Sequence, residues 1–319
     1  MKVLMTAGGS GFAGSFFVRY FLRRNKGFII VNIDKAPDSE ETVKALATSP
    51  RYHHIKGDIC NFDLIDYIMR RYRPDYIVNF IDEDSHGSAS HSMSLSNVAG
   101  THSLIESALA TWGKSGFQFN RFIQVSSDEV YGENSEGQPF TEDAFLNPCS
   151  PHAASKASAD LLSMSYAKAF GFPSVTTRLC SLYGPGQKTG SFIPEGVRAA
   201  LIDKPIEIHG DGSITREWMH VQDGCTGIIR AMFYGRPGEV YNLGSGEEAS
   251  YNDLASRLLE KLKKPRDMIK KVPVSNALPV PARFGLDSSR ARARLKWTPK
   301  YTVDEWIEES IARVRNSVE

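Results

Sequence analysis

The sequence predicts an α/β protein built on a doubly wound parallel sheet, and two observations carry that prediction. Short apolar runs alternate with helical stretches through residues 1–180. A cluster of glycines, Gly8, Gly11 and Gly14, directly follows the first apolar run. Because a parallel strand needs a crossover to reach its neighbour, usually through a helix, such alternation is typical of this fold class.

The expected elements follow in chain order. We expect strands at residues 2–6, 28–33, 76–81, 119–125 and 174–179, and helices at 12–24, 62–71, 101–112 and 151–170. Later we expect a helix near 194–202, a strand at 206–209, a strand at 240–243 and a helix at 251–262. Residues 1–180 with about 220–245 would form the sheet domain. Residues 181–219 and 246–319 would form a smaller, discontinuous C-terminal domain that binds the substrate.

The composition limits the class of partner. With 38 Lys and Arg against 37 Asp and Glu, the chain has no basic excess, so we expect neither nucleic acid nor membrane partners. The four cysteines are far apart and match no zinc or disulfide spacing, so no metal site is expected. We expect a cytoplasmic protein, because we find no export signal and no apolar run of membrane-spanning length.

The glycine cluster predicts a dinucleotide site of the Rossmann type. Glycines after a first strand let the backbone approach a pyrophosphate, and the following helix supplies N–H donors. Asp34 ends the second strand, where a carboxylate accepts from an adenosine ribose and repels a 2′-phosphate, so NAD is favoured over NADP. The alternative is a simple tight turn with Asp34 capping a loop. Gly57-Asp58-Ile59 adds an adenine contact or is itself only a turn.

Polar residues at the end of a later strand are the candidate catalytic groups. Ser127, Asp128 and Glu129 follow an apolar run, so they should emerge at the carboxyl edge of the sheet. A serine hydroxyl can bind a reacting hydroxyl or carbonyl group, and two carboxyl groups with different pKa values can act as acid and base. Two adjacent acids in a turn are otherwise usually solvated surface.

A second candidate group lies at the start of the helix predicted at 151–170. Ser150 suits the N-cap and Pro151 the first turn. His152 and Lys156 are four residues apart and share one helix face, where Lys156 could bind ribose hydroxyls and lower the pKa of a nearby acid. Such a pair is otherwise often just a polar helix face.

The ordered motifs resemble the nucleotide-sugar branch of the extended short-chain dehydrogenases, most closely the dTDP-glucose 4,6-dehydratase family. The resemblance covers nearly the whole chain. The matching stretches are TAGGSGFAG from Thr6, VNIDK from Val31, GDI from Gly57, NVAGT from Asn97, SSDEVYG from Ser126, SPHAASKASADLL from Ser150, TRLCSLYGPGQ from Thr177, IHGDGSITREWMHVQD from Ile208 and GEVYNLGSGEE from Gly238.

The resemblance implies a role for each matching residue. Ser127 would orient the C4 hydroxyl of a hexose, Asp128 would protonate the leaving C6 hydroxyl and Glu129 would remove the C5 proton. The cofactor contacts implied are Gly8, Gly11, Phe12, Gly14, Asp34, Lys35, Asp58, Ile59 and Lys156. The substrate contacts implied are Ser85, His86, Ser181, Arg216, Asn242 and Arg283. Related enzymes dimerise through the helices expected at 101–112 and 151–170, which implies a homodimer.

Two departures from the family pattern keep other functions open. His152 stands where the family has the tyrosine whose phenolate takes the C4 hydroxyl proton, and residues 80–86 replace the family's FAAESH segment. The acidic pair favours dehydration over 4-epimerisation. A nucleotide-sugar 4-epimerase, a nucleotide-sugar-binding protein with weakened catalysis, and a plain NAD-dependent sugar oxidoreductase remain the alternatives.

Overall fold

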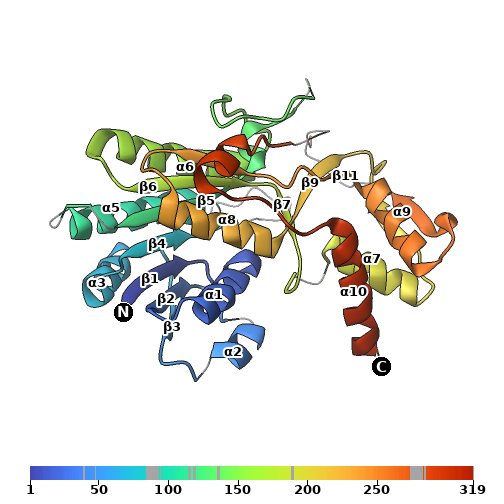
Figure 1. Ribbon diagram of the computed structural model, residues 1–319, viewed down its shortest axis with the longest axis horizontal. Helices are drawn as coiled ribbons and strands as arrows, with labels where there is room; N and C mark the ends of the chain where they lie inside the picture. Colours follow the sequence, from blue (N-terminus) through green and yellow to red (C-terminus); the bar gives the residue numbers. More distant parts are fainter. Residues whose placement is uncertain are drawn as a thin grey trace.

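Seven parallel strands form the central sheet of this computed structural model (Figure 1). The residues described are 1–38, 40–46, 48–83, 93, 95–113, 116–117, 120–134, 137–187, 190–273, 283 and 285–318. The strand order is β10-β6-β5-β4-β1-β2-β3. The strands are β1 (Lys2–Ala7), β2 (Phe28–Asp34), β3 (Tyr52–Lys56), β4 (Tyr76–Asn79), β5 (Arg121–Ser127), β6 (Ser174–Leu179) and β10 (Val240–Leu243). The predicted doubly wound sheet is confirmed.

Helices cover both faces of this sheet (Figure 1). One face is covered by α1 (Phe12–Arg24) and α8 (Val221–Tyr234), with α2 (Glu40–Leu46) beside α1. The other is covered by α3 (Phe62–Tyr72), α5 (Thr101–Trp112) and α6 (Pro151–Phe170). Short helical turns η1 (Leu95–Gly100) and η2 (Asp128–Tyr131) precede α5 and follow β5. Burial on both faces explains why β1 and β4 carry consecutive apolar residues instead of an alternation with polar ones.

A smaller lobe lies beside the carboxyl edge of the sheet (Figure 1). Its strands are β7 (Ser181–Tyr183), β9 (Thr215–His220) and β11 (Glu248–Ser250) in one sheet, and β8 (Ile206–His209) and β12 (Ile269–Val272) in another. Its helical segments are α7 (Phe192–Leu201), α9 (Tyr251–Leu262), α10 (Val303–Val318) and the turn η3 (Arg266–Met268). These elements share a separate apolar core that includes Trp306. The predicted domain limits remain a prediction, and the turn η4 (Ala291–Leu295) packs into the core beside α8.

Several element bounds differ from the predictions near the site. β4 ends at Asn79, two residues before the predicted limit, because the Asn79 side chain accepts from the amide of Ile81 and turns the chain out of the sheet. β5 continues to Ser127, because Ser126 and Ser127 still pair with β6. The predicted start of that strand at residue 119 lies outside the described residues. The helix predicted at 194–202 begins earlier, at Phe192.

A buried ion pair joins α6 to the sheet. Arg178 on β6 is 1% exposed, and its Nε donates to Asp160 Oδ2 on α6 at 2.9 Å. Its Nη1 contacts the hydroxyl of Tyr131 at 2.7 Å. That hydroxyl donates to Asn242 on β10 at 2.8 Å, so one polar network links α6, η2, β6 and β10. This network fixes α6 against the strands that end at the site.

We expect Asp160→Asn to lower the free energy of unfolding by about 3–5 kcal/mol, because it leaves the Arg178 cation buried without its counter-charge. Urea unfolding at neutral pH measures the change. The control is Glu308→Gln, which removes the partner of Lys261 in an ion pair whose Glu308 side chain is 61% exposed. That variant should lose less than about 1 kcal/mol. Equal effects in the two variants would contradict a special role for the buried pair.

Candidate active site

The glycine turn between β1 and α1 has the shape of a phosphate cradle. Gly8 has a φ of +77°, which favours glycine, and a Cβ on Gly14 would lie 2.4 Å from the carbonyl oxygen of Gly8. Gly11 is the N-cap of α1 and has no side chain to cap the first amides. These amides therefore face a region where an anionic group would be stabilised, which fits a pyrophosphate.

The predicted adenosine-side residues gather at the ends of β2 and β3. Asp34 accepts from the amides of Ser10 and Ala36, one on each carboxylate oxygen, both at 2.9 Å. Lys35 pairs with Asp58 at 3.3 Å. Two other predicted cofactor contacts lie nearby. Ile59 is buried against Gly100. Phe12, the first residue of α1, is partly buried and packs against the apolar core under α1. The structure thus brings this set together at one edge of the sheet.

One residue that the sequence did not single out stabilises the glycine turn. Asp38 accepts from the hydroxyl groups of Ser10 at 2.9 Å and Tyr52 at 2.8 Å. Its second oxygen lies 3.3 Å from His54 Nδ1. The carboxylate therefore ties the turn to β3.

The acidic pair lies where β5 leaves the sheet. Ser127 is the last residue of β5, and Asp128 and Glu129 form the first turn of η2. The Ser127 hydroxyl donates to Asp128 Oδ1 at 3.1 Å and accepts from the Glu129 amide at 3.2 Å. Among the described residues, Asp128 Oδ2 has no hydrogen-bond partner although it is buried.

The two carboxyl groups have pKa values shifted in opposite directions. Burial, followed by the negative charge of Glu129, raises the pKa of Asp128 to about 7. Burial alone would also raise the pKa of Glu129, but the hydrogen bond with His152 and the charge of Arg216 outweigh it, and this pKa is lowered. Asp128 can therefore carry a proton near neutrality while Glu129 stays ionised. A proton donor, Asp128, is therefore adjacent in the chain to a proton acceptor, Glu129.

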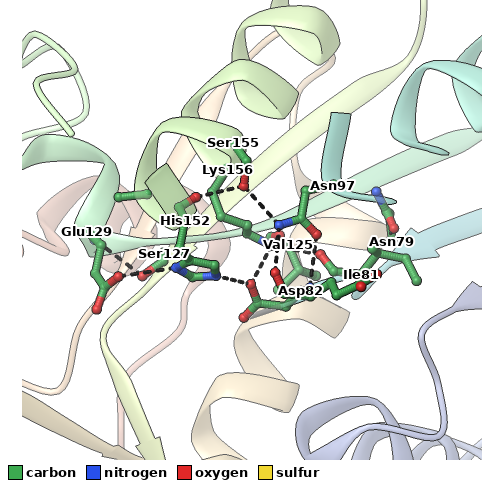
Figure 2. A network of polar contacts seen from close by, with 12 residues as sticks. Asn79, Ile81, Asp82, Asn97, Val125, Ser127, Glu129, His152, Ser155 and Lys156 are labelled. Carbon is green, nitrogen blue, oxygen red and sulfur yellow. Dashed lines mark hydrogen bonds and ion pairs between the residues drawn. The ribbon is translucent and has the colours of Figure 1, made fainter. Parts of the chain in front are cut away.

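His152 lies between two carboxylates (Figure 2). Its Nε2 is 2.7 Å from Asp82 Oδ1, and its Nδ1 is 3.4 Å from Glu129 Oε2. The hydrogen bond with Asp82, followed by that with Glu129, raises the pKa of His152 to about 10. The ring is therefore an imidazolium at neutral pH, with both nitrogens as donors.

Lys156, one helical turn further along α6, is held by the ends of two strands. Its Nζ donates to the carbonyl oxygens of Ile81 at 2.9 Å and Val125 at 3.0 Å (Figure 2). The ammonium also lies 3.6 Å from Asp82 Oδ1. Burial would raise the pKa of Asp82, but the Lys156 charge, followed by the hydrogen bond with His152, lowers it to about 2. Asp82 was not predicted from the sequence, although it lies in the altered segment 80–86.

The predicted substrate residues fall into different groups. Arg216 on β9 donates to Glu129 Oε1 at 3.0 Å, so it lies in the catalytic cluster. Arg283 makes a forked pair with Glu248, at 2.7 and 2.8 Å, further out in the small lobe. Ser181, the first residue of β7, is half-buried opposite Trp218. Ser85 and His86 lie outside the described residues.

Asn242 was predicted to hold a diphosphate, but its side chain is fully buried. Its oxygen accepts from the hydroxyl of Tyr131, and its nitrogen donates to the carbonyl oxygen of Phe140 at 2.8 Å. Both polar ends of the amide are thus used within the protein. In this structure Asn242 fastens the segment at Phe140 to the sheet and has no surface to offer a ligand.

Within the described part of the chain, no group of three or more His, Cys, Asp or Glu side chains is placed to hold a metal ion. The described helices include none that is both long and apolar enough to cross a bilayer. All four cysteines are free thiols.

Comparison with known proteins identifies the family. The family model described as GDP-mannose 4,6 dehydratase matches residues 5–310. The chain belongs to this family. It is 36% identical to the low-salt glycan biosynthesis protein Agl12 of Haloferax volcanii, over 97% of this chain and 96% of that protein. It is 32% identical to the dTDP-glucose 4,6-dehydratase of Haemophilus influenzae, over 98% and 97%. The resemblance inferred from the motifs is confirmed.

A solved structure gives the same assignment. The dTDP-glucose 4,6-dehydratase of Bacillus anthracis, crystallised in complex with NAD, matches with a TM-score of 0.89 and 31% identity. The match covers 99% of this chain and 97% of that chain. The sheet and the small lobe are therefore both part of the family fold.

We expect the Asp128 carboxyl group to titrate near neutrality, and Glu129→Gln to lower its pKa, because the neighbouring negative charge is removed while burial remains. Carbon NMR of the side-chain carboxyl groups measures both values. The control is Glu142→Gln, which removes a carboxylate that pairs with Arg290 and should leave Asp128 unchanged. A wild-type Asp128 that titrates at its ordinary value of 3.8 would contradict the acid assignment.

Proposed function

We propose that this protein is an NAD-dependent nucleotide-hexose 4,6-dehydratase. The observation that carries the proposal is the Asp128-Glu129 pair, whose pKa values are shifted apart at the carboxyl edge of β5. Elimination of water needs a group that gives a proton to the leaving oxygen and another that takes a proton from the neighbouring carbon. Adjacent carboxyl groups with separated pKa values can do both. Membership of the family supports this reaction.

We propose NAD as the cofactor, as in the complex of the Bacillus anthracis relative. The glycine turn and the open amides of α1 fit the pyrophosphate, and the carboxylate of Asp34 fits a ribose without a 2′-phosphate. When bound, NAD would accept hydride from C4 of the hexose and return it to C6, ending unchanged. Two hydrogens of the Lys156 ammonium are already donated to the carbonyl oxygens of Ile81 and Val125, so a ribose hydroxyl would bind the one that faces Asp82.

Each catalytic residue then has one task. Ser127 orients the C4 hydroxyl, and His152 in its uncharged form takes the hydroxyl proton as the C4 carbonyl forms. Glu129 removes the C5 proton, whose acidity the ketone increases, while Asp128 gives its proton to the C6 hydroxyl, which leaves as water. Glu129 exchanges its proton with solvent and protonates C5 as hydride returns to C6, leaving a 4-keto-6-deoxy sugar. We propose that Arg216 and Arg283 bind the nucleotide diphosphate, by charge-assisted forked hydrogen bonds.

We expect purified protein, incubated with a panel of nucleotide-hexoses in deuterated water, to give a product with a new methyl signal and deuterium at C5. Proton NMR detects both. Asp128→Asn should reduce product formation by about 10²–10⁴-fold while C4 oxidation continues, because only water loss needs this acid. Glu129→Gln should stop deuterium entering at C5. A retained C6 hydroxyl with inverted C4 would indicate an epimerase, and accumulating NADH a plain oxidoreductase.

A nucleotide-sugar-binding protein with weakened catalysis is the second candidate. The ion pairs on both sides of His152 favour it, because an imidazolium cannot accept the C4 hydroxyl proton. Calorimetric binding of a nucleotide-hexose without product over long incubation would support this candidate. Turnover that increases on His152→Tyr would show that the remaining residues are competent.

We also propose a cytoplasmic homodimer, with free thiols that suit a reducing compartment. Helices α5 and α6 pack side by side, and α6 exposes the large apolar side chains of Leu161 and Phe170. We expect a dimer in sedimentation velocity and a shift toward monomer in Leu161→Glu. Tyr67→Glu, a matched change at an exposed position on α3, should stay dimeric. A wild-type monomer at every concentration would contradict the proposal.

A further inference from the structure

Asp82 lies where the altered segment 80–86 meets the start of α6. It follows the end of β4 by three residues, at the same sheet edge as Ser127 at the end of β5. Its side chain is half-exposed, whereas His152 is largely covered and Lys156 is buried. Of these three side chains, that of Asp82 is therefore the most exposed to solvent.

Two cations of α6 converge on one oxygen of this carboxylate (Figure 2). Asp82 Oδ1 is 2.7 Å from His152 Nε2 and 3.6 Å from Lys156 Nζ. The segment that carries Asp82 is itself fixed, because Lys156 binds the Ile81 carbonyl and Asn97 binds both backbone polar groups of Glu83. The carboxylate is thus placed by its neighbours on both sides in the chain.

The contact on Nε2 complements the one on Nδ1. Glu129 takes the Nδ1 side, so the two carboxylates fix both the plane of the ring and its rotation about the Cα–Cβ bond. A carboxylate on one imidazole nitrogen commonly orients a histidine for proton transfer at the other. The charged groups that face the ring from the surrounding elements are Asp82 after β4, Glu129 and then Asp128 on η2, Lys156 on α6 and, through Glu129, Arg216 on β9.

We propose that Asp82 is a positioning residue for the C4 proton transfer: it binds His152 at Nε2, holds the ring at the sheet edge and determines the protonation state in which the imidazole meets the C4 hydroxyl. The proposal rests on the proposed dehydratase function. Asp82 acts through His152 and exchanges no proton with the sugar. One hydrogen bond, between His152 and Asp82, therefore joins the two parts of the chain that depart from the family pattern, the histidine and the altered segment 80–86.

The charge of Asp82 sets the sign of the expected pH dependence. An opposite charge this close stabilises the imidazolium, so its removal lowers the pKa of His152, by about 1–3 units. The imidazole takes a proton only in its uncharged form, which is populated above that pKa. The rate of C4 oxidation should therefore rise with pH through the wild-type pKa of about 10. In Asp82→Asn the same rise should occur at lower pH, and oxidation at neutral pH should be faster.

The titration of His152 tests this directly. NMR of the imidazole ring is recorded against pH on the full-length protein with NAD added, and the signal that His152→Tyr lacks is assigned to His152. We expect Asp82→Asn to shift this titration down and Asp82→Glu, which keeps the charge, to stay near the wild type. The control is Glu83→Gln, which removes the neighbouring carboxylate that pairs with Lys35 and should leave His152 unchanged.

Kinetics separates positioning from a purely structural role. The first hydride transfer is followed as a transient rise of NADH, in an Asp128→Asn background that stops the reaction before water loss. Asp82→Asn should move the pH profile of this step by the same amount as the NMR titration. In a His152→Tyr background, Asp82→Asn should no longer move the profile by that amount.

The possible failures are distinguishable. An unshifted His152 titration in Asp82→Asn would overturn the proposal, whether or not any nucleotide-hexose is converted. So would loss of C4 oxidation at every pH in Asp82→Asn with a shifted titration, because Asp82 itself would then be the proton acceptor. The expected titration shift with no conversion of any nucleotide-hexose, even in His152→Tyr, would overturn the proposed function and leave the Asp82–His152 coupling supported.

Discussion

Lys156 donates its ammonium hydrogens to the carbonyl oxygens of Ile81, two residues after β4, and Val125, near the carboxyl end of β5. Neighbouring parallel strands end side by side, but nothing in the strand ladder fixes the residues that come after it. The buried Lys156 ammonium fixes them, because it binds both the segment after β4 and the end of β5. The segment that carries Asp82 and the turn that carries Asp128 and Glu129 are therefore held relative to α6, and through α6 to His152.

Around that fixed point the charges alternate. Four charged groups form a row in which each lies beside one of opposite sign: Asp82, His152, Glu129 and Arg216. Each member lowers the cost of ionising its neighbours, so the two carboxylates keep low pKa values and the imidazole a high one. Asp128 lies next to this row but accepts only from the hydroxyl of Ser127 among the described residues. Burial and the neighbouring Glu129 charge outweigh the charge of Arg216 and raise the pKa of Asp128, so that only one acid of the adjacent pair carries a proton near neutrality.

The same reasoning bears on the substitution of tyrosine by histidine. A phenol is uncharged when protonated, whereas a protonated imidazole is a cation. Nearby carboxylates raise the pKa of both groups, because they destabilise a phenolate and stabilise an imidazolium. Placing His152 between Asp82 and Glu129 makes it a strong hydrogen-bond donor at neutral pH. As a consequence, the uncharged form of the His152 imidazole, which is the form that accepts a proton, is less populated. In the proposed mechanism, the C4 proton transfer therefore depends on these carboxylates as well as on the histidine.

Much of the site could be read from local patterns. The glycine spacing, the strand-end position of Ser127 and the N-terminal turn of α6 depend on the periodicity of a few neighbouring residues, and the helices at 101–112 and 151–170 lie at their predicted bounds. Asn242 and Asp82 could not be judged in this way. Whether an amide faces a ligand or a buried tyrosine, and whether a loop carboxylate meets a histidine 70 residues away, depends on contacts between distant segments.

The sequence by itself determined the alternation of strands and helices in the sheet domain, the dinucleotide turn and the residue types available at the sheet edge, because these follow from short-range spacing and backbone preference. Only the tertiary structure decided which of those residues are charged. The ionisation of Asp128, Glu129 and His152 depends on burial and on charges brought from β4, α6 and β9. Electrostatic energy depends on distance in space, and that distance is set by the packing of the whole sheet.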